Sequence, residues 1–205
     1  MIAAFGADAT RLFVLFAAPV ENELRWSWDP DGCCEIRKVE PLKRAKQGLD
    51  VFFDQVGSQD SVGLTIFSDR IQPVIPVGPF ARNERRLRAT VENLIADGGT
   101  AVYDATIEGF EDVRADATPE RISAVVVLTD GEDTDSSADA DDVVRAVRAQ
   151  GDSDDQVRVF TIAYSAGAVG AKEALDEIAK ASGGQPYEGD TEDIEAVYRS
   201  ISSFF

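Results

Sequence analysis

Oxygen-bearing side chains follow the predicted strands of this chain and are the residues best placed to do chemistry. Carboxylates and hydroxyls suit a hard divalent cation such as Mg²⁺, Mn²⁺ or Ca²⁺, and they suit zinc or copper poorly. The sequence contains no histidine, which excludes a His-based catalytic triad, a His general base and a His zinc ligand. The candidates are Asp29, Asp31, Ser68, Asp69, Thr100, Thr129, Asp130, Glu132, Asp133 and Tyr164.

Composition narrows the functional classes further. The 205 residues include 38 acidic and 20 basic side chains, for a formal charge of -18, and 44% of them are hydrophobic, enough for a globular core. This charge argues against nucleic acid as a partner, because phosphate contacts need clustered Lys and Arg, and it disfavours anionic membrane surfaces. The longest apolar run, residues 12–20, is too short to span a membrane. The adjacent Cys33 and Cys34 allow neither a disulfide framework nor a four-thiolate zinc site.

Strand and helix patterns alternate along the chain. Strands are predicted where short runs are continuously apolar or alternate with polar residues, and helices where apolar residues recur every three to four positions. The predicted strands are residues 12–17, 24–28, 62–67, 71–75, 123–128, 157–163 and 185–187. The predicted helices run from about residue 39 to 57, then over residues 84–94, 101–114, 141–150, 172–181 and 191–202.

This alternation predicts a three-layer α/β fold, in which a doubly wound, mostly parallel sheet carries helices on both faces. Pro73, in the second strand of the hairpin over residues 62–75, favours an antiparallel strand at one edge. We expect a single domain over residues 1–205, in which residues 1–38 are a divergent N-terminal part with strand one and room for an extra strand or hairpin. Ligands of such sheets bind beyond the carboxyl ends of the strands, where the candidates above should meet.

Five segments of the chain carry a resemblance to a known family. Residues 97–105 (DGGTAVYDA) and 125–134 (VVVLTDGEDT) look like two hallmark segments of the von Willebrand factor A (vWA) domain family. Residues 60–68 resemble its second strand, residues 159–164 its fifth strand, and residues 175–201 its last two helices. The likeness covers about residues 39–205, and its specificity comes from five segments in the family's order.

The resemblance implies a six-stranded doubly wound sheet, a metal-ion-dependent adhesion site and a non-enzymatic role in binding protein partners. In this family a carboxylate of the partner often completes the metal shell. Carried over by position, Thr100 would be a metal ligand, directly or through water, and Asp130 a water-mediated ligand. The loops that would contact the partner carry Ser68, Asp69, Gly99 and Gly131.

The family's first motif, Asp-x-Ser-x-Ser after strand one, is not present in this sequence, and two registers are possible. In the first register, strand one is residues 24–28, and Asp29 and Asp31 stand in the motif as metal ligands. The spacing to the first predicted helix favours this register.

In the second register, strand one is the more apolar segment, residues 12–17, and hydrophobicity favours this choice. Ala17, Pro19 and Glu21 then stand in the motif, which removes its metal ligands. In either register two serine hydroxyls are missing. We therefore expect a site that binds Mg²⁺, Mn²⁺ or Ca²⁺, or a degenerate site on a metal-free scaffold.

An enzymatic alternative starts from the same turn. The segment DPDGC at residues 29–33 also resembles the Asp-x-Asp-Gly-Thr start of the haloacid-dehalogenase phosphatases, in which Asp29 would be the nucleophile and Asp31 the general acid beside Mg²⁺. Against it, Trp-Ser-Trp is a poor buried strand, cysteine replaces the threonine, and no later segment clearly supplies the family's lysine and aspartate. A protein-binding module is therefore our expectation, with no enzymatic activity.

Two charged stretches have simple explanations. The acidic residues 132–142 are expected to form a solvated loop and a helix start, where carboxylates favour the helix dipole. A second stretch is a cluster of arginines, which are Arg82, Arg85, Arg86 and Arg88. We expect these arginines to form an exposed helix face; the alternative is a docking patch for an acidic partner.

The location of the protein in the cell is left open by the sequence. Residues 1–8 lack the basic region of a signal peptide, so the chain as given is expected to be cytoplasmic. The tail also resembles vWA domains at the ends of longer bacterial proteins, so an excised domain of a bacterial cell-surface protein is the alternative.

Overall fold

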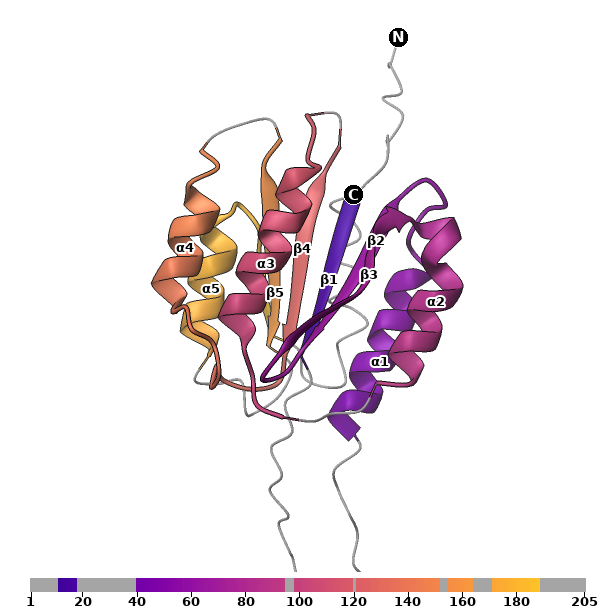
Figure 1. Ribbon diagram of the computed structural model, residues 1–205, viewed down its shortest axis with the longest axis horizontal. Coiled ribbons are helices and arrows are strands. Elements are labelled where there is room, and N and C mark those ends of the chain that lie inside the picture. Colours follow the sequence, from indigo (N-terminus) through magenta and orange to yellow (C-terminus); the bar gives the residue numbers. More distant parts are fainter. Residues whose placement is uncertain are drawn as a thin grey trace, which may run out of the picture.

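The computed structural model describes residues 11–17, 40–94, 98–119, 121–151, 155–163 and 171–188. In these ranges the chain forms the α/β architecture that the sequence predicts, with helices on both faces of a central sheet (Figure 1). None of the helices in the described part of the chain is both long enough and apolar enough to cross a membrane.

The described strands form one six-stranded sheet in the order β3-β2-β1-β4-β5-β6. Neighbouring strands are parallel except for β2 and β3, which makes β3 the expected antiparallel edge strand. This topology confirms the doubly wound fold. The strands are β1 (Arg11–Ala17), β2 (Ser61–Phe67), β3 (Ile71–Pro79), β4 (Ser123–Thr129), β5 (Val157–Ala163) and β6 (Pro186–Glu188).

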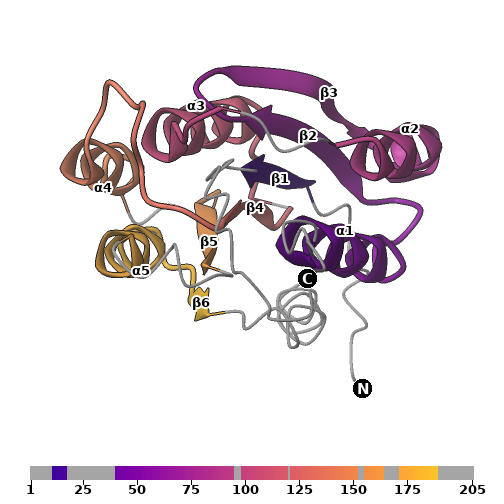
Figure 2. The same cartoon turned by 90° about the horizontal axis from the view of Figure 1, so that it is seen from below.

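Helices α1 and α2 cover one face of the sheet, and α3, α4 and α5 cover the other (Figure 2). The helix predicted over residues 191–202 lies outside the described residues. The described helices are α1 (Glu40–Phe53), α2 (Phe80–Glu92), α3 (Val102–Ala115), α4 (Ala140–Arg148) and α5 (Lys172–Ala181).

β4 connects the two hydrophobic cores, and all of its residues are buried. Val126 and Leu128 pack in the core beneath α1 and α2, whereas Val125 and Val127 pack in the core beneath α3, α4 and α5. Successive side chains of a strand point to opposite faces, so a strand with a core on each side needs apolar residues at every position. Each of these buried side chains contributes roughly 1.5–3 kcal/mol to folding.

β1 identifies the register of the first strand. It pairs with β2 on one side and β4 on the other, so Arg11–Ala17, which is apolar from residue 12 onward, is a central strand. The register that took residues 24–28 as strand one is therefore wrong, although those residues themselves lie outside the described ranges. The physical reason is burial: a central parallel strand covered on both faces must be continuously apolar, which Trp-Ser-Trp is not.

The boundaries of β3 and α2 differ from those expected. β3 continues to Pro79 instead of residue 75, and α2 begins at Phe80 instead of residue 84. In the described sheet β3 has a partner on one side only, so its proline residues Pro73, Pro76 and Pro79 need not interrupt a second ladder of hydrogen bonds. The edge position thus lets a proline-rich segment form a longer strand than its composition suggests.

The N-terminus of α4 offers a test of local stability. The Asp139 carboxylate accepts a hydrogen bond from the Asp142 N–H (2.9 Å), and the Asp142 carboxylate accepts one from the Asp139 N–H (3.2 Å). This capping box satisfies amides that the helix itself cannot. We expect Asp139→Ala to lower the free energy of unfolding by about 1 kcal/mol in urea denaturation, and Asp139→Ser to lower it much less.

The same cap should make stability fall in acid. The backbone hydrogen bond from Asp139, followed by the hydrogen bond from Arg145, holds the pKa of Asp142 below its ordinary value of 3.8. Because the folded-state pKa is the lower one, the contribution of Asp142 is complete at neutral pH and is lost as the pH falls below about 4. An Asp142→Asn variant keeps an oxygen acceptor but cannot titrate, so unchanged acid sensitivity of this variant in that range would contradict this account.

Candidate functional site

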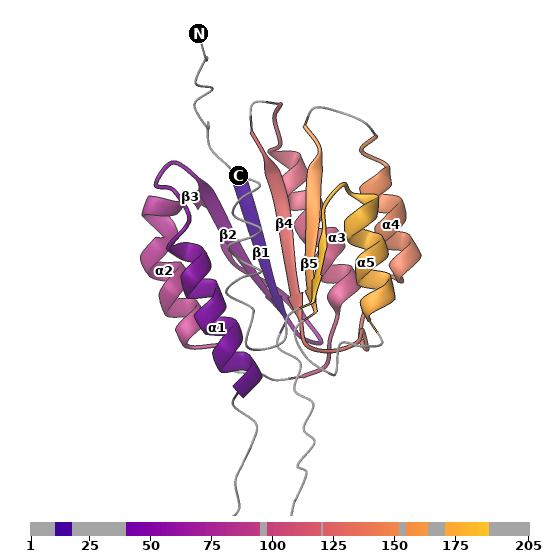
Figure 3. The same ribbon diagram turned by 180° about the vertical axis from the view of Figure 1, so that it is seen from behind.

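Three parallel strands end side by side at one edge of the sheet. Ala17, the last residue of β1, pairs with Phe67 at the end of β2, and Phe16 pairs with Leu128 near the end of β4. The segments that follow β2 and β4 therefore start at the same edge, at the bottom of Figure 1 and, seen from behind, of Figure 3. This is the carboxyl edge of the sheet, where the sequence predicts a site.

Thr100 connects the segments at this edge through its backbone. Its N–H donates to Oγ1 of Thr134 (2.9 Å) and to Oδ2 of Asp135 (3.1 Å), and its carbonyl accepts from the N–H groups of the same two residues (2.8 and 3.0 Å). The N–H of Ala101 donates to the carbonyl of Ser68 (2.8 Å). The segment around Thr100 is thus fixed between the turn after β2 and the loop after β4.

We call the three segments together the loop edge; they are residues 68–70, 98–101 and 130–139. Thr100 and Asp130 both belong to it, so the two hallmark segments meet at one edge as the resemblance implies. Asp29, Asp31 and Tyr164 lie outside the described residues. The loop edge also contains the predicted partner-contacting residues Ser68, Asp69, Gly99 and Gly131.

Asp130 begins the loop after β4. Its side chain is half-buried, and its Oδ1 atom is shielded from solvent. The preceding hydroxyl, of the fully buried Thr129, donates to the carbonyl of Gly131 (3.0 Å) and accepts from the Gly131 N–H (3.3 Å). The turn that presents Asp130 is therefore held by a side chain of β4 itself.

The acidic loop is more than the solvated segment expected from its composition. Asp133 accepts hydrogen bonds from the N–H and the hydroxyl of Ser136, and Ser136 Oγ accepts from the N–H groups of Tyr103 and Asp104 (both 3.1 Å). The Asp104 carboxylate in turn accepts from the N–H groups of residues 137 and 138 (2.8 and 2.9 Å). The loop thus satisfies the first amides of α3, which have no partner within the helix.

Sequence reasoning missed this role of residues 133–136, although a signal for it exists. Short side chains such as Asp, Ser and Thr compete with regular structure by hydrogen-bonding nearby backbone groups. The run Asp-Thr-Asp-Ser is rich in them. The sequence does not reveal which backbone amides donate to these side chains. The donors lie in and just before α3, 30 to 35 residues earlier in the chain.

The loop edge is electrically negative. Burial raises the pKa of the Tyr103 hydroxyl, and the neighbouring charge of Asp133 raises it further, followed by smaller contributions from other acidic residues of the loop. Nearby negative charge disfavours the anionic form of a tyrosine. Asp69, Glu132 and Asp135 add exposed carboxylates to the same edge.

Gly99 is packed so closely against this loop that no side chain fits. A Cβ atom there would lie within bonding distance of the Asp135 carboxylate and 2.9 Å from Oγ1 of Thr134. The neighbouring Gly98 has φ +90°, a backbone conformation that residues with a side chain rarely adopt. The double glycine is therefore required by the approach of the loop after β4.

The packing at Gly99 makes a double-mutant prediction. We expect Gly99→Ala to lower the free energy of unfolding by about 2 kcal/mol, because the added methyl group displaces the Asp135 carboxylate. Asp135→Ala removes the atoms that clash, so Gly99→Ala should cost about 1 kcal/mol less in that background. Urea denaturation of the two single variants and the double variant measures the coupling, and strictly additive effects would show that the loop does not contact Gly99.

The loop edge, as far as the structure describes it, does not contain the complete ligand set of a metal-ion-dependent adhesion site. Because β1 ends at Ala17, the positions of Asp-x-Ser-x-Ser hold Ala17, Pro19 and Glu21, and the leading carboxylate of the motif is lost. Thr100 is only 2% exposed. Among the described residues, no group of three or more Asp, Glu, Cys or His side chains is placed to hold a metal ion. The phosphatase alternative expects Asp29 directly after strand one, whereas β1 ends at Ala17.

The fold and the loop edge place this chain in a known family. The von Willebrand factor type A domain family matches residues 31–199, and the chain belongs to that family. The match begins after β1, the strand that is followed by the altered motif.

Solved structures with little sequence identity share the fold. The structure of a von Willebrand factor type A protein from Catenulispora acidiphila superposes with a TM-score of 0.69 at 15% identity, covering 95% of this chain and 42% of that one. The PilB minor pilin from Streptococcus sanguinis gives 0.62 at 15% identity, covering 96% and 61%. Proximal thread matrix protein 1 from the mussel byssus, in a structure with a zinc-occupied MIDAS motif (the metal-ion-dependent adhesion site), gives 0.65 at 15% identity, covering 95% and 47%. The present chain thus spans about half the length of the mussel protein.

Proposed function

We propose that this chain is a non-enzymatic protein-binding module that contacts its partner through the loop edge without a divalent ion. The observation that carries the proposal is the assignment of β1 to Arg11–Ala17, which leaves alanine where the motif requires aspartate. Membership of the vWA family supports binding as the function, and likeness to a pilin and a byssal matrix protein agrees with a role in adhesion or assembly.

A metal-free loop edge favours a basic partner. In a metal-ion-dependent site the cation attracts a carboxylate of the partner, but here the exposed charged groups are mainly carboxylates, on Asp69, Glu132 and Asp135, and Arg70 is an exposed cation beside Asp69. A partner carboxylate would be repelled, whereas Lys or Arg side chains would be attracted and guided to the edge. This differs from the acidic partner side chain expected from the resemblance.

The hydrogen bonds at the loop edge prepare it for binding. Thr100 exchanges four hydrogen bonds with Thr134 and Asp135, all through backbone groups of Thr100. A surface that is already ordered loses less conformational entropy when a partner binds. In this arrangement protein hydrogen bonds perform the ordering that a metal ion provides in a complete adhesion site.

Site-specific crosslinking tests the proposed surface. We expect a photoreactive amino acid at Asp69 or Glu132, both exposed on the loop edge, to capture a partner in cells that produce the protein. The matched control is Gln59, which is exposed just before β2, at the opposite edge of the sheet. Mass spectrometry of the products should identify the same partner from both edge positions, and equal capture from Gln59 would contradict the proposal.

Thermal unfolding tests the proposed independence from metal. We expect millimolar MgCl₂, MnCl₂ or CaCl₂ to raise Tm no more than NaCl of the same ionic strength, because an ion that binds only the folded state must stabilise it. A saturable rise in Tm that disappears in Thr100→Ala would instead show a functional metal site. Thr100→Ala keeps the backbone hydrogen bonds of this residue, so it isolates the hydroxyl group.

A further inference from the structure

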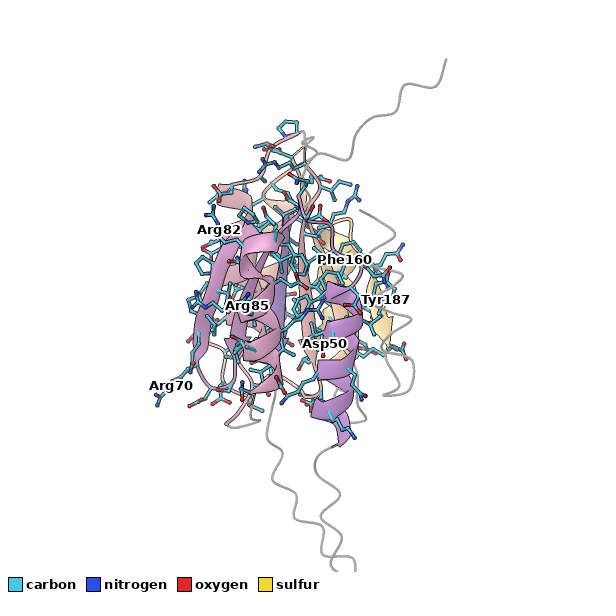
Figure 4. The ribbon with its side chains drawn as sticks, turned by 90° about the vertical axis from the view of Figure 1, so that its right-hand side faces the viewer. Asp50, Arg70, Arg82, Arg85, Phe160 and Tyr187 are labelled. Atoms are coloured by element: carbon cyan, nitrogen blue, oxygen red, sulfur yellow. The ribbon has the colours of Figure 1, made fainter. Side chains whose placement is uncertain are left out.

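α2 presents a row of arginines on a strongly acidic protein. Arg82, Arg85 and Arg86 are exposed on this helix, and Arg70 is exposed in the turn between β2 and β3. Figure 4 shows Arg82, Arg85 and Arg70 one below another along the side of the molecule formed by β3 and α2. We call these four residues the arginine face.

The acidic residues next to this face are already paired with a different arginine. Arg88 forms ion pairs with Asp54 (2.8 Å), Glu84 (3.1 Å) and Asp50 (3.4 Å), and its guanidinium lies 5.6 Å from the centre of the Phe53 ring. Burial opposes the charge of Arg88, but its hydrogen bonds to Asp54 and Glu84 outweigh this and raise its pKa. Arg88 therefore connects α2 to α1, and its ion pairs engage the acidic side chains nearest the arginine face.

The arginines of the face itself have little to neutralise them. Within the described residues, Arg82 and Arg85 form no ion pair or hydrogen bond, and Arg86 donates only to the carbonyl of Val74 (2.8 Å). Arg70 has one loose contact, 3.7 Å from its chain neighbour Asp69. Three guanidinium groups on α2 thus retain their charge and most of their hydrogen-bond donors.

The positions of these arginines oppose the stability of the helix. Arg82 lies in the first turn of α2, which contains no acidic residue, and a positive charge there is unfavourable with the helix dipole. Arg82 and Arg86 are four residues apart, a spacing at which like charges repel. Local arrangements that work against folding are expected at functional or strained sites.

The surface along α2 is hollowed as well as charged. One depression lies between the turn after β2 and the second half of α2, and another lies along its first half; they adjoin at Arg86 and Ala89, which line both. The small exposed side chains of Ala81 and Ala89 leave the helix surface accessible between the arginines. The 13 residues of α2 extend over about 20 Å, which an extended peptide spans with about six residues.

We propose that the arginine face binds a short acidic segment of a partner protein in extended conformation. Guanidinium groups form paired hydrogen bonds with carboxylates, so Asp and Glu side chains fit the unused donors of Arg82 and Arg85. A short segment meets only this face, whereas a nucleic acid or an anionic membrane would also meet the acidic remainder of a chain with a charge of -18. Arg70 belongs to both this face and the loop edge, but Arg82, Arg85 and Arg86 lie on α2 outside the loop edge. Substitutions on α2 therefore test this proposal without altering the loop edge, so either proposal can fail without the other.

Fluorescence anisotropy with a labelled hexaglutamate peptide tests the proposal. We expect saturable binding at low salt that weakens as NaCl is added, and no binding of labelled hexaglutamine. The double variant Arg82→Gln/Arg85→Gln should bind roughly tenfold more weakly. Its Tm should equal or exceed that of the parent, because the substitutions remove charges that oppose the helix.

A matched pair of arginines on α4 provides the control. Arg145 and Arg148 are also exposed and three residues apart, and each is paired with an acidic residue, Asp142 (2.6 Å) and Glu177 (3.7 Å). Arg145→Gln/Arg148→Gln changes the net charge equally and should leave peptide binding within about twofold of the parent.

Four outcomes would overturn the proposal. Two come from the peptide assay: no binding of hexaglutamate at low salt, or a loss of hexaglutamate affinity in the α4 variant as large as in the α2 variant. The other two are binding of short single-stranded DNA or anionic vesicles as tight as that of hexaglutamate, and self-association of the protein that the α2 variant abolishes.

Discussion

The position of β1 between β2 and β4 is the constraint on which the rest of the molecule depends. A parallel strand with helices on both faces has no solvent-exposed side, so only a continuously apolar segment can occupy it. Residues 12–17 of β1 are all apolar and only Arg11, at the start of the strand, is charged; the pairing of β1 aligns Ala17 with Phe67 of β2 and Phe16 with Leu128 of β4. This single register determines which loops meet at the carboxyl edge and which residues stand in the altered adhesion motif.

The loop edge is held together by hydrogen bonds between carboxylates and backbone amides. Carboxylates of Asp104, Asp133 and Asp135 accept hydrogen bonds from backbone amides, and one of these amides, of Tyr103, lies in the first turn of α3. Amides at a helix start attract anions, and here the anions are supplied by the protein itself. The same residues therefore stabilise α3, position Thr100 and give the edge its negative charge, which links the stability of the fold to the choice of partner.

Much of the fold could be predicted from the sequence because its signals are local. The apolar run before Asp130 and the spacing of Leu49, Phe52 and Phe53 each indicate burial without knowledge of the rest of the chain. The register of strand one could not be decided in this way, because hydrophobicity and motif spacing favoured different segments. The hydrogen bonds of Asp135 were also beyond reach, since they join residues that only the folded sheet brings together. Local patterns predict elements, whereas contacts between loops depend on topology.

Charge is segregated on this protein in a way that its net charge does not reveal. The pairing of Arg88 with acidic residues of α1 and α2 leaves Arg82 and Arg85 unneutralised, while the loop edge at the end of β4 is acidic. Charged surfaces within about 10 Å of a partner steer its approach at physiological salt, whereas the charge of more distant parts is screened. Two partners of opposite charge can therefore be attracted to different sides of the same domain. The two surfaces that we propose would thus select partners of opposite charge.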